Sequence, residues 1–271
     1  MKLLDVRDGT VSSGRRHLDV VRLPGLMPYL PMWDRQRALA AARQQQRIVD
    51  LLVLLEHPHV YTNGRGGRRE HLLVGDATLA RMGASYQEVD RGGDLTYHGP
   101  GQLVGYVIID LDSAGLGVRT YVRGLEQVLV RTAAYFGVKA DIVPGYTGAW
   151  VGDEKLAAIG VRVNRGVAYH GFAMNVDPDL SYFNAIVPCG IAGRGVTSLA
   201  RLLGDHVPVA EAAVVCAEAF AEVFDLELRW GESTPSPDRV DEGSKGSNAF
   251  KSHDKRARHC TGHRAYVKDR L

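Results

Sequence analysis

The stretch RGGDLTYHGPGQLVGYVIIDL, Arg91 to Leu111, joins two patterns that decide how this chain folds. Its first part sets four glycines and a proline around Thr96, Tyr97 and His98. Its second part, residues 103–111, is an apolar run rich in β-branched and aromatic residues, which predicts a buried central strand. A polar, glycine-rich loop that leads directly into such a strand is typical of a site wall, and His98 is a first candidate for its chemistry.

Around this strand the predicted elements follow one another irregularly. Apolar residues at three- and four-residue steps predict helices over 32–50, 118–138 and 210–228. A buried strand is predicted at 51–55, a short one within 85–93, and a β-meander over 149–177 with turns at 152–153 and 164–166. This hairpin-rich order favours an α/β (α+β) fold with mixed, largely antiparallel sheets and packed helices, rather than a doubly wound parallel sheet.

Composition bounds the kind of protein. The 271 residues predict one domain over 1–230, while residues 231–271 hold almost no aliphatic side chains and are expected to be a disordered tail. The formal net charge of +2 gives no reason to expect a nucleic-acid partner. No segment has a signal peptide's apolar core or the roughly 20 apolar residues of a membrane span, so we expect a cytoplasmic protein without a membrane partner.

The three cysteines are odd in number and widely spaced, which fits a reducing compartment and no disulfide framework. No CxxC pair is present, so no structural metal site is expected. Cys216 lies on the apolar face of a predicted helix, and Cys260 lies in the tail. Cys189 lies between Pro188 and Gly190, near Arg194 and a possible helix start. That setting suits either a reactive thiol or an inert loop thiol.

A nucleophilic thiol needs a group that accepts its proton, and the sequence offers His98, His170 and Lys155. Lys155 stands out because apolar residues surround it in KLAAIGVRV, a predicted strand. Partial desolvation of an amine favours its neutral form, which can take and return protons. The alternative is an edge-strand lysine with its amine in water.

Two glycine-rich motifs and one histidine pair leave other chemistries open. GIAGRGVTS, residues 190–198, has the glycine spacing of a phosphate loop but carries Val196 where the lysine belongs. NGRGGRR, residues 63–69, is either an anion cradle or a solvated basic loop. His57 and His59 have the spacing of a metal pair but lack further ligands nearby, so loop histidines are expected.

Several motifs then match a known family in order along the chain: RGGDLTYHGPGQLVGY (91–106), GDEKLAAIGVRV (152–163), YHGFAMNV (169–176), IVPCGI (186–191) and GVTSL (195–199). From about Glu56 to Leu199 the sequence resembles the octanoyltransferases of lipoate biosynthesis, the lipoyl(octanoyl) transferases. The resemblance implies the biotin/lipoate protein ligase fold, an α/β structure with mixed sheets. That fold agrees with the irregular order of the predicted elements.

The resemblance implies an enzyme that moves an octanoyl group from octanoyl-acyl carrier protein to a lysine amine. The acceptors it implies are the lipoyl domains of 2-oxoacid dehydrogenases and the glycine cleavage H protein. Cys189 matches the family nucleophile, which carries a thioester, and Lys155 matches its activating lysine; no cofactor is implied. The matching substrate-binding residues are Arg91, Gly92, Gly93, Asp94, Leu95, Thr96, Tyr97, His98, Ala158, Ile159, Gly160, Gly171, Phe172 and Ala173.

Under this reading His98 orients or hydrogen-bonds, and the glycines at 92, 93, 160 and 171 make a slot for the acyl chain. Arg65, Arg68, Arg69 and Arg91 are expected to form a basic rim that favours an acidic carrier protein. Two alternatives remain open. One is an ATP-dependent lipoate or biotin protein ligase, for which NGRGGRR is the supporting feature. The other is a non-catalytic module that binds a carrier protein or a lipoyl domain.

Overall fold

The apolar run after the glycine loop forms the centre of a large mixed sheet. The computed structural model describes residues 15–187 and 194–237. There the run forms β6 (Gln102–Asp110), whose side chains are all buried except that of Asp110, which is half-buried. β6 pairs antiparallel with β2 (Asp50–Glu56) on one side and with β10 (Val167–Asn175) on the other. Since every residue of β10 is buried as well, the middle of this sheet is covered on both faces.

The rest of the large sheet extends from this pair in both directions. Beyond β2 lie β1 (Arg16–Leu26) and β12 (Leu226–Gly231), and these three strands run parallel. Beyond β10 the neighbours alternate antiparallel: β9 (Glu154–Asn164), β8 (Tyr146–Val151) and β7 (Asp141–Val143). A short strand, β11 (Gly195–Val196), runs parallel beside the start of β9.

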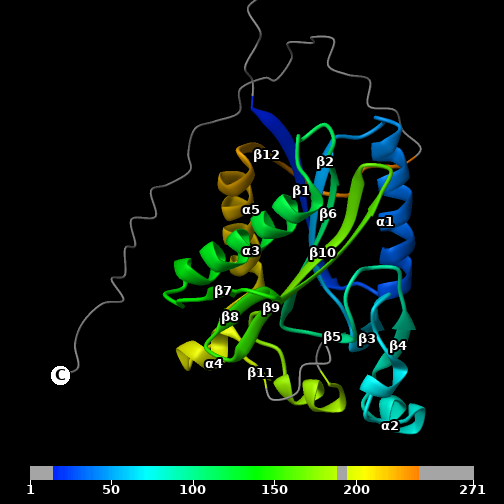
Figure 1. Ribbon diagram of the computed structural model, residues 1–271, viewed down its shortest axis with the longest axis vertical. Helices are drawn as coiled ribbons and strands as arrows, with labels where there is room; N and C mark the ends of the chain where they lie inside the picture. The colour runs from blue at the N-terminus through cyan, green and yellow to red at the C-terminus, as the bar shows by residue number, and fades with distance from the viewer. Residues whose placement is uncertain (1–14, 188–193, 238–271) are drawn as a thin grey trace, which may run out of the picture. The chain divides into compact units, whose positions relative to one another are not determined.

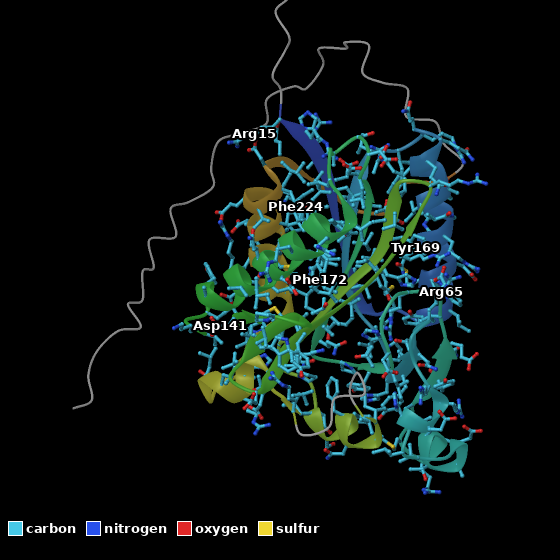
Figure 2. The ribbon with its side chains drawn as sticks, viewed as in Figure 1. Arg15, Arg65, Asp141, Tyr169, Phe172 and Phe224 are labelled. Carbon is cyan, nitrogen blue, oxygen red and sulfur yellow. The ribbon has the colours of Figure 1, made fainter. Side chains whose placement is uncertain are left out.

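Helices cover the two faces of this sheet (Figure 1). α1 (Tyr29–Gln44) packs on one face, where it shares a core with β2, β6 and β10. α3 (Val118–Tyr135) and α5 (Val209–Phe224) pack together on the other face, over a larger core. In Figure 2, Tyr169 lies on the α1 side of β10 and Phe172 on the α3 side, in agreement with their two cores.

A second, three-stranded sheet carries the glycine loop. β3 (Val60–Asn63) is its middle strand, with β4 (Ser85–Glu88) parallel to it and β5 (Thr96–His98) antiparallel. The short helices η1 (Arg69–His71), α2 (Asp76–Arg81) and η2 (Leu180–Ala185) belong to this region of the chain, and η2 packs against β5. The last short helix, α4 (Leu199–Leu203), follows β11.

The predicted fold class is confirmed, with corrections to individual elements. The first helix begins at Tyr29, ahead of Pro31, because a proline in the first turn removes no helical hydrogen bond. Its predicted C-terminal end is wrong, since the helix ends at Gln44 and Asp50 already belongs to β2. The last residues of the predicted 210–228 helix form β12 instead. The turns at 152–153 and 164–166 lie where predicted, between β8 and β9 and between β9 and β10.

The described chain continues past β12 as far as Pro237. Arg35 donates hydrogen bonds to the backbone oxygens of Thr234 and Pro235, and Arg47 donates one to that of Pro237. The division into a domain over 1–230 and a disordered tail over 231–271 stays a prediction. Among the described residues, no helix is long and apolar enough to cross a membrane.

One glycine of β6 is required by the packing of the sheet. A Cβ at Gly105 would lie 2.2 Å from Cζ of Phe172, its cross-strand partner on β10. We therefore expect Gly105→Ala to lower the free energy of unfolding by about 1–3 kcal/mol, because an overfilled core forces side chains off their rotamers. Urea unfolding measures this effect. Gly231→Ala is the control: the atom nearest to its Cβ position lies 3.6 Å away, an ordinary contact, so an equal loss there would contradict the steric cause.

Candidate functional site

A cavity of about 570 Å³ lies where the glycine loop meets β9 and β10. The loop contributes one wall, and the adjoining stretches of β9 and β10 contribute the facing wall. The structure brings most of the predicted site residues together around it: Arg91, Gly92, Gly93, Asp94, Thr96, His98, Lys155, Ala158, Ile159, Gly160, Gly171, Phe172 and Ala173. Three segments far apart in sequence thus form one concave site.

Leu95 and Tyr97 do not line this cavity. Both are fully buried in a separate apolar cluster around the small sheet, whereas Thr96 and His98 face the cavity. The cause is the alternation of side chains along a strand, which sends neighbouring residues of β5 to opposite sides. A role of Leu95 and Tyr97 in substrate binding stays a prediction, and it would have to involve their backbone.

The glycine loop is fixed in place by its own backbone. The Gly92 N–H donates to the Val161 oxygen of β9 at 2.9 Å. A side chain at Gly160 would meet the stem of Arg91 and the Gly92 oxygen, each at 3.0 Å. At Gly171 it would approach the Gly105 oxygen to 2.2 Å. Neighbouring backbone and side-chain atoms therefore pack directly against Gly160 and Gly171. They fill the space that a side chain would take at these two positions.

Lys155 is buried in the wall of the cavity. Its side chain is 8% exposed, and Nζ lies 4.8 Å from the ring centroid of Trp150, a cation–π contact. The alternative of an edge-strand lysine is wrong, because β9 lies between β8 and β10 and Lys155 is buried. Its backbone is held too, because β9 pairs at Lys155 with Val196 of β11 and the Thr197 N–H donates to the Lys155 oxygen at 3.1 Å.

Cys189 lies outside the described residues, as do the other residues of 188–193, including part of the GIAGRGVTS motif. The described flanks of that segment are fixed near the cavity walls. On one side the Val187 N–H donates to the His71 oxygen, and the His71 ring contacts the carboxylate of Asp94 at 2.7 Å. On the other side Gly195 and Val196 run beside the first residues of β9.

Cys216 is a core residue, as predicted. It is fully buried in α5, and burial raises the pKa of its thiol to about 12. A thiol that stays protonated at neutral pH is a poor nucleophile. Among the described residues, Cys216 has no disulfide partner.

His98 lines the cavity, and His57 lies behind it with the two ring centroids 6.0 Å apart; both are buried and uncharged. Burial lowers the pKa of His98 to about 3, with nearby His57 and Arg91 adding to the effect. Burial likewise lowers the pKa of His57 to about 4, in part opposed by its hydrogen bond to the Met27 oxygen. Both rings are therefore neutral at pH 7. His57 Nε2 pairs with the Tyr106 hydroxyl at 2.5 Å, so this ring is engaged by protein and is a loop histidine, as the sequence predicts.

These histidines predict a pH-dependent stability. Each has a folded pKa below the value of about 6.5 for an unfolded histidine, so the unfolded state binds protons first as the pH falls. The contribution of these histidines to the free energy of unfolding is fully present above about pH 6.5. It is expected to decrease toward pH 4, by at most about 1.4 kcal/mol per pH unit for each group. Urea unfolding between pH 8 and pH 5 measures the slope. In His57→Gln the number of protons taken up on unfolding, which sets this slope, should fall by about one. An unchanged slope would contradict the assignment.

A second set of polar contacts, centred on Asp90, lies on the α1 side of the same wall. The Asp90 carboxylate accepts hydrogen bonds from Trp33, the Tyr169 hydroxyl and His170 Nε2. Burial alone would raise the pKa of Asp90, but the bonds from His170 and Tyr169 outweigh it and lower the pKa. Burial lowers the pKa of His170 as well, although Asp90 opposes that shift. His170 has a positive φ of 59°, and its N–H donates to Gln36 of α1. His170 is thus a fixed part of the wall.

The predicted basic rim needs one correction. Arg91 is 7% exposed and donates to the Thr62 backbone and side-chain oxygens, so it belongs inside the cavity. Arg65 and Arg68 are exposed, next to Gly66 at the cavity. Arg69 is partly exposed, bonded to Asp76 and stacked on Tyr86.

Some lining residues were not predicted from the sequence. Tyr29 comes from the start of α1, Tyr106 from β6, Val122 from α3 and Tyr146 from β8. Tyr106 lies in a run whose apolar character explains it as core, and no local signal marks Tyr29 or Val122. Only the packing of the helices on the sheet places them at the site.

Comparison with known proteins shows the family of the chain. Residues 28–221 match the family model of the lipoyl protein ligase A/B catalytic domain. The chain is 48% identical over 213 residues to an octanoyltransferase of Solibacter usitatus, covering 79% of this chain and 96% of that relative. It is 49% identical over 208 residues to an octanoyltransferase of Chloroflexus aurantiacus, covering 76% and 93%.

Solved structures give the same fold at low sequence identity. Lipoate-protein ligase A bound with ATP matches with a TM-score of 0.65 and 18% identity, over 82% of this chain and 90% of that one. A bipartite lipoate protein ligase from Thermoplasma acidophilum matches with a TM-score of 0.59 and 18% identity, over 81% and 88%. Identities this low establish the fold alone, and the sequence matches carry the closer relationship. The chain belongs to the lipoyl protein ligase A/B catalytic domain family and, within it, to the octanoyltransferases.

Proposed function

We propose that this enzyme transfers an octanoyl group from octanoyl-acyl carrier protein to the lysine amine of apo lipoyl domains, in the cytoplasm, through a thioester on Cys189. The proposed acceptors are the lipoyl domains of 2-oxoacid dehydrogenases and the glycine cleavage H protein. The observation that carries the proposal is the buried Lys155 in a cavity that the predicted acyl-binding residues surround. The identity to octanoyltransferases over most of the chain supports the same reaction.

In the first half reaction, Cys189 attacks the carbonyl carbon of the octanoyl thioester. The bond from that carbon to the pantetheine sulfur breaks, and a new bond to the Cys189 sulfur forms. Lys155 takes the proton of the Cys189 thiol and gives it to the leaving pantetheine sulfur. One thioester replaces another, so the step is close to thermoneutral and needs no separate activation of the acid.

In the second half reaction, the acceptor lysine amine attacks the same carbonyl carbon. An amide forms, and the Cys189 sulfur leaves and recovers its proton. Lys155 takes the proton from the attacking amine and returns it to that sulfur. An amide is more stable than a thioester, so this step proceeds without ATP. The position of Lys155 in the cavity wall suits both steps, because the predicted acyl-binding residues surround it there.

The contacts of the NGRGGRR loop disfavour an ATP-dependent ligase. The N–H groups of Arg65, Gly66 and Gly67 donate to the oxygens of Arg91, Gly93 and Gly64. A phosphate cradle needs such backbone N–H groups to be available to the anion. Here those of Arg65 and Gly66 hold the acyl-binding loop instead, and that of Gly67 closes a turn within its own loop. A non-catalytic binding module would have no use for a buried lysine in its ligand cavity, so that alternative is disfavoured too.

The decisive experiment omits ATP. The full chain is incubated with octanoyl-acyl carrier protein, and the intact protein is analysed by mass spectrometry. We expect a mass increase of one octanoyl group that hydroxylamine removes, localised to Cys189 by peptide mapping, and transfer to an added apo lipoyl domain. Absence of the adduct from the wild-type protein would refute the proposal. Modification of the lipoyl domain from free octanoate, with a strict requirement for ATP, would support the ligase.

A further inference from the structure

We propose that a buried chain of hydrogen bonds, running from Arg91 through Thr62, His98, Gln102 and Asn175 to Thr197, positions the acyl-binding loop relative to Lys155. The inference rests on the proposed function, and it assigns a positioning role to residues that carry no proton in the proposed reaction. Every side chain in this series of hydrogen bonds is at least nine-tenths buried. Its members come from both sheets: Thr62 from β3, His98 from β5, Gln102 from β6 and Asn175 from β10.

The contacts form a continuous series. Arg91 donates to Thr62 Oγ1 at 2.9 Å, and Thr62 Oγ1 lies 3.3 Å from His98 Nε2. His98 Nδ1 lies 2.8 Å from Gln102 Oε1. Gln102 Nε2 then donates to Asn175 Oδ1 at 2.9 Å, and Asn175 Nδ2 donates to the Thr197 backbone oxygen at 2.9 Å.

The chemistry of these groups gives the series a single direction. Gln102 Nε2 also donates to the Tyr97 oxygen, so Gln102 Oε1 is the acceptor and His98 Nδ1 carries the proton. The neutral ring then accepts at Nε2 from the Thr62 hydroxyl, and that hydroxyl oxygen accepts from Arg91. Each side chain donates a hydrogen bond to the next residue in the series, so none can exchange its donor and acceptor atoms without breaking a bond. Such a network has one satisfied arrangement, and losing a member leaves a buried partner unpaired.

The two ends of the series meet β9 at different points of the cavity wall. At one end Arg91 belongs to the acyl-binding loop, where its stem packs on the Gly160 position of β9. At the other end the Thr197 N–H donates to the Lys155 oxygen at 3.1 Å. Thr197 also follows β11 directly, so the series fixes the short strand that pairs with Lys155. The position of the acyl-binding loop relative to Lys155 thus depends on the buried side chains that join the two ends.

The test compares Thr62→Val, Asn175→Leu and the double variant in single-turnover formation of the octanoyl thioester on Cys189. Saturating octanoyl-acyl carrier protein separates positioning from donor binding. We expect each single variant to be slower by about tenfold or more, and the double variant to be slower by about as much as the slower single one, because the first break already uncouples the ends. Asn175→Ser replaces Asn175→Leu if the latter fails to fold, as judged by circular dichroism.

Thr132→Val is the matched control. Thr132 is fully buried like Thr62, and its hydroxyl donates to the Val128 oxygen within α3, away from the series. Its thioester should form within about twofold of the wild-type rate, at a temperature where all variants are folded. A Thr62→Val rate equal to that of Thr132→Val, or single effects that multiply in the double variant, would overturn the inference while the proposed function stands. A wild-type protein without a thioester would overturn both.

Discussion

Cys189→Ser is expected to abolish octanoyl transfer, lowering the rate by at least about a thousandfold. A serine hydroxyl is far less acidic than a thiol, so the loss of its proton to Lys155 no longer produces a competent nucleophile. The variant should also show no octanoyl adduct by mass spectrometry after incubation with octanoyl-acyl carrier protein. Because the substitution removes no volume of note, circular dichroism and the thermal midpoint should stay close to those of the wild type.

Cys216→Ala provides the control for this prediction. Cys216 is fully buried in α5 and its pKa is raised to about 12 by burial, so it should neither carry the acyl group nor react with iodoacetamide in the native protein. The control should lose some stability and keep its thioester. Retention of the adduct in Cys189→Ser, or its loss in Cys216→Ala, would contradict the assignment of the nucleophile.

Lys155→Arg is expected to lower the rates of both half reactions by about a hundredfold or more. Arginine keeps the positive charge, but its guanidinium does not give up a proton in proteins, so it cannot act as the base. Single-turnover measurements resolve the two steps: formation of the thioester from the carrier protein, and its discharge to a lipoyl domain. Lys155→Met removes both the charge and the proton transfer, and it should be at least as slow.

Lys139→Met is the control, because Lys139 is exposed and lies outside the cavity. It should leave both half reactions unchanged. If Lys155→Arg formed the thioester at the wild-type rate, the charge of the residue would suffice and proton transfer would have to be assigned elsewhere. His98 is a poor replacement, since its lowered pKa of about 3 keeps it neutral and its two ring nitrogens already have partners.

The sequence predicted the central strand, the order of the meander and the class of fold because those features are local. The apolar run of residues 103–111 is buried whatever packs on it, and glycine or asparagine turns mark the hairpins. β1 and its parallel pairing with β2 and β12 were not predicted. Parallel neighbours are joined by long connections, so no turn motif marks them in the sequence. β1 and β12 pair although more than 200 residues separate them along the chain.

Within the proposed site, the sequence by itself determined the residue types on which the proposed chemistry depends: the thiol at 189, the lysine at 155, and the glycine loop from Arg91 to His98. Only the tertiary structure decided that Lys155 is buried, that Thr96 and His98 face the cavity while Leu95 and Tyr97 face away, and that Arg91 belongs inside. Only the tertiary structure shows, likewise, that the His98 ring is neutral and that both of its nitrogens have hydrogen-bond partners. The physical reason is that a residue's chemistry is written in its type, whereas its burial, charge state and partners depend on segments brought together by the fold.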